Sequence, residues 1–308
     1  MGTPEFAVPC LDILIKNNYD VVAVVTAPDK PAGRGQELKK SAVKKFAVKN
    51  GIKILQPEKL KDEKFIDELK SLRADLQIVV AFRMLPEVVW DMPPLGTYNL
   101  HASLLPKYRG AAPINWAIIN GEKETGVTTF KLQHQIDSGS ILFQEKVKIN
   151  ETTTAGELHD ELMRVGSELI LKSVKVIETK NYELKQQDDL VAIHAPKIFK
   201  ETCKIDWNKS SDEIYNLIRG LSPYPGAYTE FKDAAGNLQG LKIFSSEKEK
   251  TNHNSPNGLL TADGKTFLKA TCADGFINLK GLQLQGKKRM GVEEFLRGNK
   301  FPENCIFL

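Results

Sequence analysis

The sequence predicts an α/β protein, in which a Rossmann-like, doubly wound domain is followed by a small OB-like β-barrel. Two apolar, β-branched runs, residues 19–27 and 74–82, have the composition of buried parallel strands. Helical periodicity lies between them, in residues 41–51 and 63–72. Strands that alternate with helices are typical of a parallel sheet covered on both faces, so this pattern predicts the first domain.

Later elements of this domain follow from the same patterns. "GTYNLHA" (96–102) predicts a strand, residues 112–120 predict a helix, and "TGVTTFKL" and "SILFQEKVKI" predict a pair of neighbouring strands. A long helical pattern at about 154–179 closes the domain. We therefore expect the first domain to comprise residues 1–181.

The rest of the chain has a different character. Residues 182–203 have mixed polarity and no clear period, which predicts a linker on the surface. One helix, "SDEIYNLIRGL", is then followed by short strands separated by turns such as "YPGAY" and "NSPNG". Short strands at this spacing are typical of a small β-barrel, which we expect at residues 204–308.

The segment "MGTPEF" at residues 1–6 resembles the glycine turn that follows the first strand of a Rossmann-like unit. Pro4 suits the start of a helix, but no apolar strand precedes the turn. We expect that this strand is missing and that the natural protein starts several residues earlier. The alternative is that another segment fills its place. No GxGxxG motif is present, so the sequence does not predict a nicotinamide cofactor.

Composition limits the class of protein. The chain has 308 residues, 41% of them hydrophobic and 27% charged, and no apolar run long enough to cross a membrane. We expect a cytoplasmic protein. The four cysteines are far apart and show no metal-ligand spacing, so they predict reduced, buried side chains and no metal site.

Positive charge is concentrated near the N-terminus. The whole chain has a net charge of +4, whereas residues 29–49 alone have seven basic and two acidic side chains. A charge run of this kind is usually a solvated helix face or loop. The other interpretation is a surface for a partner that carries phosphate groups.

Asn99, His101 and Asp137 are the candidate catalytic residues. Residues two apart in a strand point to the same face, so Asn99 and His101 should project together at the end of a strand, where α/β sheets bind ligands. An amide and an imidazole can hold an oxyanion, and a carboxylate in the "QIDSGS" turn could orient the imidazole. Taken alone, a structural histidine and a turn-forming aspartate are equally good interpretations.

The segments "NLHASLLPKYRGAAPINWAI" and "TGVTTFKLQHQIDSGSIL" resemble the signature of the 10-formyltetrahydrofolate-dependent formyltransferases. "GTPEFAVP", "TAPDKPAGRGQELKKSAVKKFA" and "KIDWNKSSDEIYNLIRGLSPYPGAYTEF" resemble those members that act on methionyl-tRNA in translation initiation. The similarity spans nearly the whole chain. It implies a formyltransferase domain followed by a tRNA-binding domain.

This resemblance assigns roles to residues. It implies that Asn99, His101 and Asp137 form the catalytic set. It implies that the folate-binding residues are Ser103, Leu104, Leu105 and Pro106 in "SLLP" and Arg83, Met84 and Leu85 in "AFRMLP". For the methionyl-tRNA substrate it implies Phe6 in the pocket for the methionine, with Lys30 and Arg34 in the loop that meets the acceptor end.

The implied reaction moves the formyl group of 10-formyltetrahydrofolate, as co-substrate, to the α-amine of initiator methionyl-tRNA, without a metal. We expect a monomer with no membrane contact. One alternative is an N-formyltransferase that acts on a sugar-nucleotide amine, since that group has similar motifs. Another is an RNA-binding protein without catalytic activity, against which the presence of Asn99, His101 and Asp137 argues.

Overall fold

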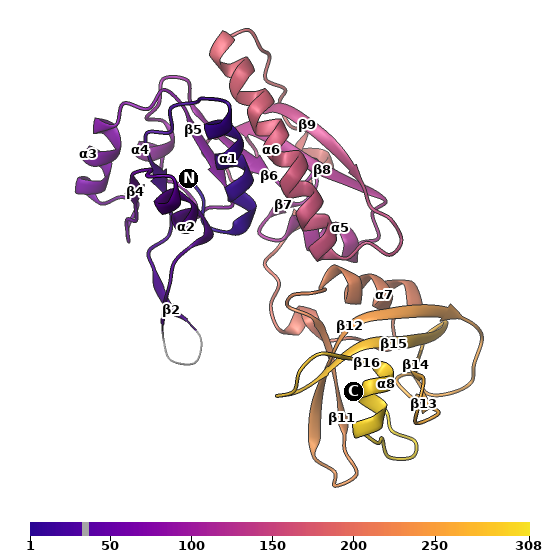
Figure 1. Cartoon of the computed structure of the whole chain (residues 1–308). Coiled ribbons are helices and arrows are strands. Elements are labelled where there is room, and N and C mark those ends of the chain that lie inside the picture. Colours follow the sequence, from indigo (N-terminus) through magenta and orange to yellow (C-terminus); the bar gives the residue numbers. More distant parts are fainter. Residues whose placement is uncertain (33–36) are drawn as a thin grey trace. The chain divides into compact units, whose positions relative to one another are not determined.

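The computed structural model describes residues 1–32 and 37–308, which form two compact units. The first comprises Met1–Pro113, Glu124–Lys148 and His159–Ala195. The second comprises Ile114–Lys123, Ile149–Leu158 and Pro196–Leu308. Figure 1 shows the elements of each unit along the chain.

The first unit has the α/β composition that the sequence predicts. Its main sheet contains β5, β6, β8 and β9 in that order, with β5 and β6 parallel and the other pairs antiparallel. Two short parallel strands, β1 and β4, form a separate sheet. The strands are β1 (Val24–Val25), β2 (Lys30–Ala32), β3 (Glu37–Lys39), β4 (Ile54–Leu55), β5 (Gln77–Val80), β6 (Thr97–His101), β7 (Arg109–Gly110), β8 (Glu124–Lys131), β9 (Ile141–Lys148) and β10 (His194–Ala195).

Helices α2 (Ala42–Lys49) and α3 (Glu63–Ser71) begin at side-chain caps that the sequence provides. The Ser41 hydroxyl accepts the Lys44 N–H at 3.0 Å, and the Asp62 carboxylate accepts the Phe65 N–H at 3.1 Å. The helices are η1 (Glu5–Ala7), α1 (Val8–Lys16), α2 (Ala42–Lys49), α3 (Glu63–Ser71), α4 (Glu87–Trp90), η2 (Asp189–Val191) and the long α6 (Ala155–Thr179). The long helix expected at 154–179 is thus confirmed.

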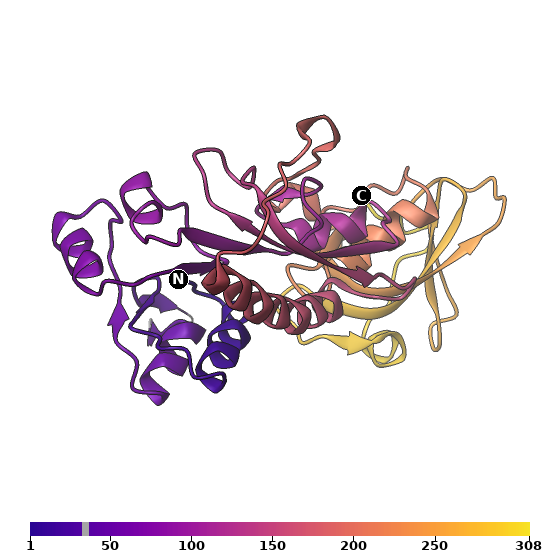
Figure 2. The same ribbon diagram turned by 90° about the horizontal axis from the view of Figure 1, so that it is seen from above.

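Helix α6 covers one face of the main sheet, along which it lies in both views (Figures 1 and 2). The Ser173 hydroxyl of α6 is 2.9 Å from the Thr129 hydroxyl of β8. Gly166 lies directly against Leu100 of β6, so that an added Cβ would approach Leu100 Cδ2 to 2.8 Å. The even-numbered residues of β6 therefore face this helix, and its odd-numbered residues face the other side.

The run at residues 19–27 is a strand only at Val24–Val25, which differs from the expected long strand. A hollow of about 730 Å³ separates this run from residues 74–80. Met1 and Gly2 stand at one end: the Gly2 N–H donates to the Val25 carbonyl at 3.0 Å, and the Met1 carbonyl accepts the Val80 N–H at 2.9 Å. The rest of the run is irregular because nothing in the described chain pairs with its edge along the hollow.

The second unit is β-rich, and its sheet curls into a half-barrel. The strand order is β11-β12-β15-β14-β13, and β16 also pairs with β15. Within the described ranges no pairing of β11 with β13 closes this sheet, so the structure shows less than the expected closed barrel. The strands are β11 (Ala227–Lys232), β12 (Leu238–Lys250), β13 (Leu260–Ala262), β14 (Leu268–Cys272), β15 (Gly275–Leu284) and β16 (Met290–Gly291).

Aromatic side chains form much of the core of the second unit. Trp207 stacks on Phe307 at a centroid distance of 5.2 Å, and its indole N–H donates to the Thr229 hydroxyl at 3.0 Å. A capping box between Ser210 and Glu213 starts α7. The helices are α5 (Pro113–Ile119), η3 (Glu201–Cys203), α7 (Ser211–Gly220) and α8 (Val292–Gly298). The first residue of α5, Pro113, still belongs to the first unit.

Two further expectations concern the cysteines and membrane-spanning helices. All four cysteines are buried and free. Among the described residues no helix has the length and apolar character needed to cross a membrane.

The amino group of Met1 gives a prediction about pH. This group donates to the Ile78 carbonyl at 2.6 Å, and burial lowers its pKa from 8.0 to about 6. Between pH 6 and 8 the unfolded chain therefore binds more protons than the folded one. For a protein whose first residue is Met1, we expect the free energy of unfolding to rise by on the order of 2 kcal/mol between pH 6 and pH 8. Urea titrations at both pH values measure this difference.

Two proteins with added N-terminal residues distinguish the effect of the amine charge on stability from the effect of the unfilled hollow. Adding Met-Val-Ile-Val before Met1 converts the amine into an amide and supplies apolar residues that can fill the hollow, so stability should rise and the pH effect should vanish. Adding Met-Ser-Gly-Ser should remove the pH effect without the same gain. An unchanged pH dependence in both proteins would contradict this account of the amine.

Candidate active site

The site lies at the carboxyl ends of parallel strands. Val80 of β5 is opposite Leu100 of β6, and Gly2 bridges to Val80 in the same parallel sense. The segments that leave this row therefore begin at one edge of the sheet. They are residues 3–6, 81–86 and 101–110, which contain most of the candidate residues in the first unit. This edge is where open α/β sheets bind ligands.

Asn99 and His101 project from the face of β6 opposite α6, as their spacing predicts. The strand forms because Thr97, Tyr98 and Leu100 are buried between neighbouring elements. Asn99 is half-buried, and across residues 1–32 and 37–308 its side-chain amide has no hydrogen-bond partner. An amide of this kind can donate to a ligand oxygen.

His101 is buried, with 7% of its surface exposed. Its Nε2 lies 2.8 Å from the Tyr108 carbonyl oxygen, and its Nδ1 lies 3.9 Å from Asp137 Oδ2. A carbonyl oxygen can only accept, so Nε2 carries a proton. Nδ1 is therefore the ring atom that can gain or lose a proton beside the carboxylate.

Asp137 lies in the loop between β8 and β9, yet it reaches the end of β6. Its Oδ2 accepts the Gly110 N–H at 2.9 Å, and its φ of +53° places it in the left-handed region. Aspartate adopts this conformation more readily than most residues. The structure thus brings together His101 and Asp137, which are 36 positions apart in the sequence.

The "SLLP" segment is a tight turn with a cis peptide bond between Leu105 and Pro106. The Ser103 hydroxyl donates to the Lys107 carbonyl at 2.6 Å, and the Thr128 hydroxyl donates to the Ser103 carbonyl at 2.6 Å. Ser103 and Leu105 are buried, whereas Leu104 and Pro106 are partly exposed. The Ser103 side chain therefore holds the turn, and the partly exposed members are those that can touch a ligand.

The loop at 81–86 is held by the side chain of Arg83. Its guanidinium donates to the Glu58 carbonyl at 2.7 Å and to the Pro57 carbonyl. Its Nε–H is buried without a partner in the described part of the chain. Met84 is 75% exposed, whereas Leu85 is buried. Of the three candidate side chains in this loop, Met84 is thus the one that is open to a ligand.

The residues expected at the methionyl-tRNA substrate differ from one another in exposure. Phe6 is buried and meets the ring of His159 edge-on at 5.3 Å. Lys30 is exposed in β2, which pairs with β3. Arg34 lies outside the described residues.

Sequence reasoning missed Gln187 and Arg109. Gln187 Nε2 donates to the carbonyls of Asp137 and Gly139, each at 2.8 Å, and its Oε1 accepts from the Arg109 guanidinium. Gln187 lies in the segment without a clear period, where no sequence pattern distinguishes it from the adjacent Gln186. Arg109 belongs to the quoted motif "KYRG", but the sequence predicted no hydrogen-bond partner for its side chain.

Two family models match the chain. The formyl transferase model matches residues 1–174, and the formyl transferase C-terminal domain model matches residues 197–300. Relatives resemble the chain along almost its whole length. Methionyl-tRNA formyltransferase of Bacteroides thetaiotaomicron is 53% identical over 307 residues, which are 98% of this chain and 95% of the relative.

The chain belongs to the methionyl-tRNA formyltransferase family. The enzyme of that name from Flavobacterium johnsoniae is 56% identical over 306 residues, or 99% of this chain and 96% of the relative. This assignment decides against the two alternatives, the sugar-nucleotide enzyme and the inactive RNA-binding protein.

Solved structures share the fold at lower identity. WlaRD, a sugar 3N-formyl transferase crystallised with dTDP and 5-N-formyl-THF, is 23% identical, with a TM-score of 0.66 over 93% of this chain and 97% of that one. HypX from Aquifex aeolicus in complex with tetrahydrofolic acid is 18% identical, with a TM-score of 0.59 over 83% and 45%. At these identities the likeness shows the fold alone.

The close approach at Gly110 gives a prediction. Gly110 has a φ of +122°, and an added Cβ would lie 2.7 Å from the Ala195 carbonyl oxygen. Because relief of this clash must move the N–H that Asp137 accepts, Gly110→Ala should lower both stability and turnover. We expect a loss of about 2 kcal/mol in the free energy of unfolding, measured by urea titration.

Gly51→Ala is the matched control. Gly51 also has a positive φ, +67°, but nothing lies within 4 Å of its added Cβ. This variant should lose only about 1 kcal/mol and keep full turnover. Equal effects of the two substitutions would show that the contact at Ala195 is unimportant.

Proposed function

We propose that this protein transfers the formyl group of 10-formyltetrahydrofolate to the α-amine of initiator methionyl-tRNA. The observation that carries the proposal is the pairing of His101 with Asp137, with the unpartnered Asn99 amide on the same strand face. All three lie at the edge of the sheet where ligands bind. The membership of the family supports the choice of substrates.

In the proposed reaction the neutral amine attacks the formyl carbon. The carbonyl oxygen of the formyl group becomes an oxyanion as the C–N bond forms. Asn99 Nδ2–H and protonated His101, through Nδ1–H, stabilise this charge, and each such donor contributes roughly 3 kcal/mol in enzymes of this kind. Asp137 orients His101 and helps to carry the proton from the amine, through water, to N10 of the folate, whose bond to carbon then breaks.

The proposed folate site uses the two loops beside the catalytic residues. The "SLLP" turn offers Leu104 and Pro106 as partly exposed apolar contacts. The loop at 81–86 offers exposed Met84 as a further apolar contact, while the Arg83 side chain holds the loop from within. The Ser103, Leu105 and Leu85 side chains support these loops from within.

The proposed contacts with methionyl-tRNA begin in the first unit. Phe6 follows the turn after Gly2 and lies at the catalytic edge, so we assign it to the pocket for the methionine side chain. Lys30 is an exposed cation in the basic segment, and Arg34 follows four positions later in the sequence. We assign both to the phosphate groups of the acceptor end, because such charges supply most of the affinity for RNA.

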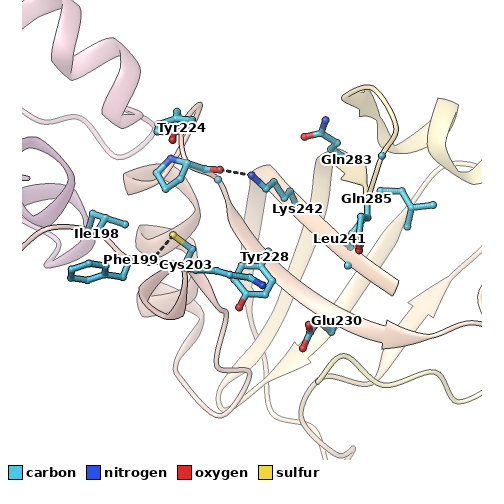
Figure 3. A pocket seen from close by; sticks show the side chains of 16 residues that line it. Ile198, Phe199, Cys203, Tyr224, Tyr228, Glu230, Leu241, Lys242, Gln283 and Gln285 are labelled. Atoms are coloured by element: carbon cyan, nitrogen blue, oxygen red, sulfur yellow. Dashed lines mark hydrogen bonds between the residues drawn. The ribbon is translucent and has the colours of Figure 1, made fainter. Parts of the chain in front are cut away.

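We assign a second RNA surface to the C-terminal unit. A cavity of about 640 Å³ there is lined by Tyr224, Tyr228 and Phe199, together with Lys200 and Lys242 (Figure 3). Tyr224 is 82% exposed and Phe199 is 57% exposed. Aromatic faces beside cations suit unpaired bases and their phosphates.

The basic hairpin at residues 286–290, "GKKRM", adjoins this cavity, since Gly286 belongs to the lining. Its cations are partly used within the protein: Lys288 pairs with Glu294 at 3.0 Å, and Arg289 lies over the ring of Phe244 at 4.5 Å. By contrast, Lys242 Nζ donates to the Pro225 carbonyl at 2.8 Å and has no carboxylate partner among the described residues (Figure 3). Lys242 is therefore a better candidate for a phosphate contact than Lys288 or Arg289.

A direct assay tests the proposed function. Purified protein and 10-formyltetrahydrofolate are incubated with initiator methionyl-tRNA or with a sugar-nucleotide amine, and formylated product is measured. We expect rapid formylation of the methionyl-tRNA and little of the sugar. The reverse preference would overturn the proposal.

Substitutions at the three catalytic candidates give a sharper prediction. Asn99→Ala, His101→Ala and Asp137→Asn should each lower kcat by about 10²- to 10³-fold, because these groups act on charge that develops in the transition state. Folate binding should change little, as equilibrium titration can show. The exposed His134 provides a control: His134→Ala should keep normal turnover. Normal turnover in any of the three variants would remove that residue from the mechanism.

A lysine substitution tests the surface of the second unit. Lys242→Gln should weaken binding of methionyl-tRNA and reduce the slope of log K against log salt concentration by about one phosphate contact. Lys265→Gln, at an exposed turn between β13 and β14, is the matched control and should leave both unchanged. Identical salt slopes in the two variants would argue against an RNA contact at Lys242.

A further inference from the structure

The side chain of Gln187 connects two parts of the first unit that meet at the candidate site. Its Nε2 donates to the Asp137 carbonyl and to the Gly139 carbonyl, each at 2.8 Å. Its Oε1 accepts from Arg109 Nε at 3.0 Å and from Arg109 Nη2 at 2.7 Å. One half-buried amide thus makes four hydrogen bonds to groups that are 48 to 78 positions away in the sequence.

These partners leave one orientation for the amide. The guanidinium offers only donors and the two carbonyls offer only acceptors, so a rotated amide would place N–H against N–H and oxygen against oxygen. Arg109 is itself held by Asp189 at 2.7 Å. The backbone of Arg109 is also fixed, because its N–H donates to the Ile193 carbonyl at 2.8 Å.

The hydrogen bonds form a closed circuit around Asp137. Gln187 holds the backbone of the turn at Asp137 and Gly139, and it also holds the side chain of Arg109. The residue after Arg109 is Gly110, whose N–H donates to Asp137 Oδ2 at 2.9 Å. The main chain of Asp137, through Gln187, and its carboxylate, directly, are therefore hydrogen-bonded to the same segment, Arg109–Gly110.

We propose that Gln187 is a positioning residue that fixes the Asp137 carboxylate beside His101. The inference rests on the proposed function, because it gives Asp137 a role in turnover. Gln187 acts through Asp137, and its polar atoms are taken by protein groups rather than by substrate. Without this amide the carbonyls of Asp137 and Gly139 lose the donor that Gln187 supplies. Gln133 Nε2 still donates to the Ser138 carbonyl between them at 2.9 Å, so the turn is loosened at these two positions rather than released.

Gln187→Ala tests the proposal directly. We expect kcat for formylation of methionyl-tRNA to fall by about 10- to 100-fold, since misplacement of a catalytic group by about 1 Å can cost this much. The KM for 10-formyltetrahydrofolate should stay within about twofold, because the folate loops keep their own hydrogen bonds. Gln186→Ala is the matched control: it removes an exposed glutamine from the adjacent position and should leave kcat unchanged.

A double-mutant cycle separates positioning from general stability. In an Asp137→Asn background the carboxylate is already absent, so adding Gln187→Ala should lower kcat by less than about twofold. A residue that only stabilises the fold would cause the same loss in both backgrounds. Equal losses in the two backgrounds, or normal kcat in the single variant, would overturn the proposal.

A second variant covers the case in which Gln187→Ala does not fold. Gln187→Glu keeps the size of the side chain and the contact with Arg109, but it places an oxygen against the carbonyls of Asp137 and Gly139. We expect the same loss of kcat, with a thermal midpoint close to that of the unmodified protein. Unmodified protein that fails to formylate methionyl-tRNA would overturn the proposed function and this inference together. Active unmodified protein with fully active Gln187 variants would overturn this inference alone.

Discussion

The parallel register of β5 and β6 is the constraint on which the rest of the site depends. With Val80 opposite Leu100, the chain leaves both strands at the same edge of the sheet. Gly2 bridges to Val80 in the same sense, so the segment that contains Phe6 starts from this edge too. A shift of one residue would turn Asn99 and His101 towards α6 and bury them against its apolar face. The buried Leu100, packed against Gly166, makes such a shift costly.

The loops at this edge have little regular structure, and side chains supply their hydrogen bonds. Thr128, Gln144 and Ser103 hold the "SLLP" turn, and Arg83 holds the loop at 81–86. A buried backbone carbonyl without a partner is costly, so these polar side chains stabilise conformations that the backbone alone would not keep. The same bonds keep a ligand site formed before a ligand arrives. This arrangement agrees with a reaction in which donors must be in place as charge develops.

The N-terminal part of the first unit shows how pairing, rather than composition, decides strand length. Residues 19–27 are rich in β-branched side chains, but only Val24 and Val25 form a strand, because these residues pair with β4. Their other edge borders the hollow, where the Gly2 N–H donates to the Val25 carbonyl. β-propensity describes a fit to neighbouring strands, so it cannot form a strand where a neighbour is lacking.

The sequence by itself determined the order of the elements and nominated Asn99, His101 and Asp137 as candidate catalytic residues. Alternating apolar and helical periods located α2, α3, α6 and the pair β8–β9, because these periods reflect contacts of each segment with the core. The spacing of Asn99 and His101 determined that they share a face, because side chains in a strand alternate. The family motifs covered Asp137 and the loops at 81–86 and 103–106, but they did not give the geometry of any of them.

The tertiary structure alone decided which groups meet. Gln187 joins the turn of Asp137 to Arg109, and the Gly110 N–H donates to the Asp137 carboxylate. These hydrogen bonds span 27 to 78 positions, and no local period records such contacts. The Ser103 hydroxyl donates to the Lys107 carbonyl of its own turn, a contact that no sequence pattern predicts. In the described chain β11 and β13 of the second unit do not pair with each other, and residues 305–308 hydrogen-bond to both ends of the curled sheet instead. Turn spacing does not report this, because closure depends on strand pairing. Sequence patterns report what each segment buries, and the fold determines which distant polar groups then satisfy one another.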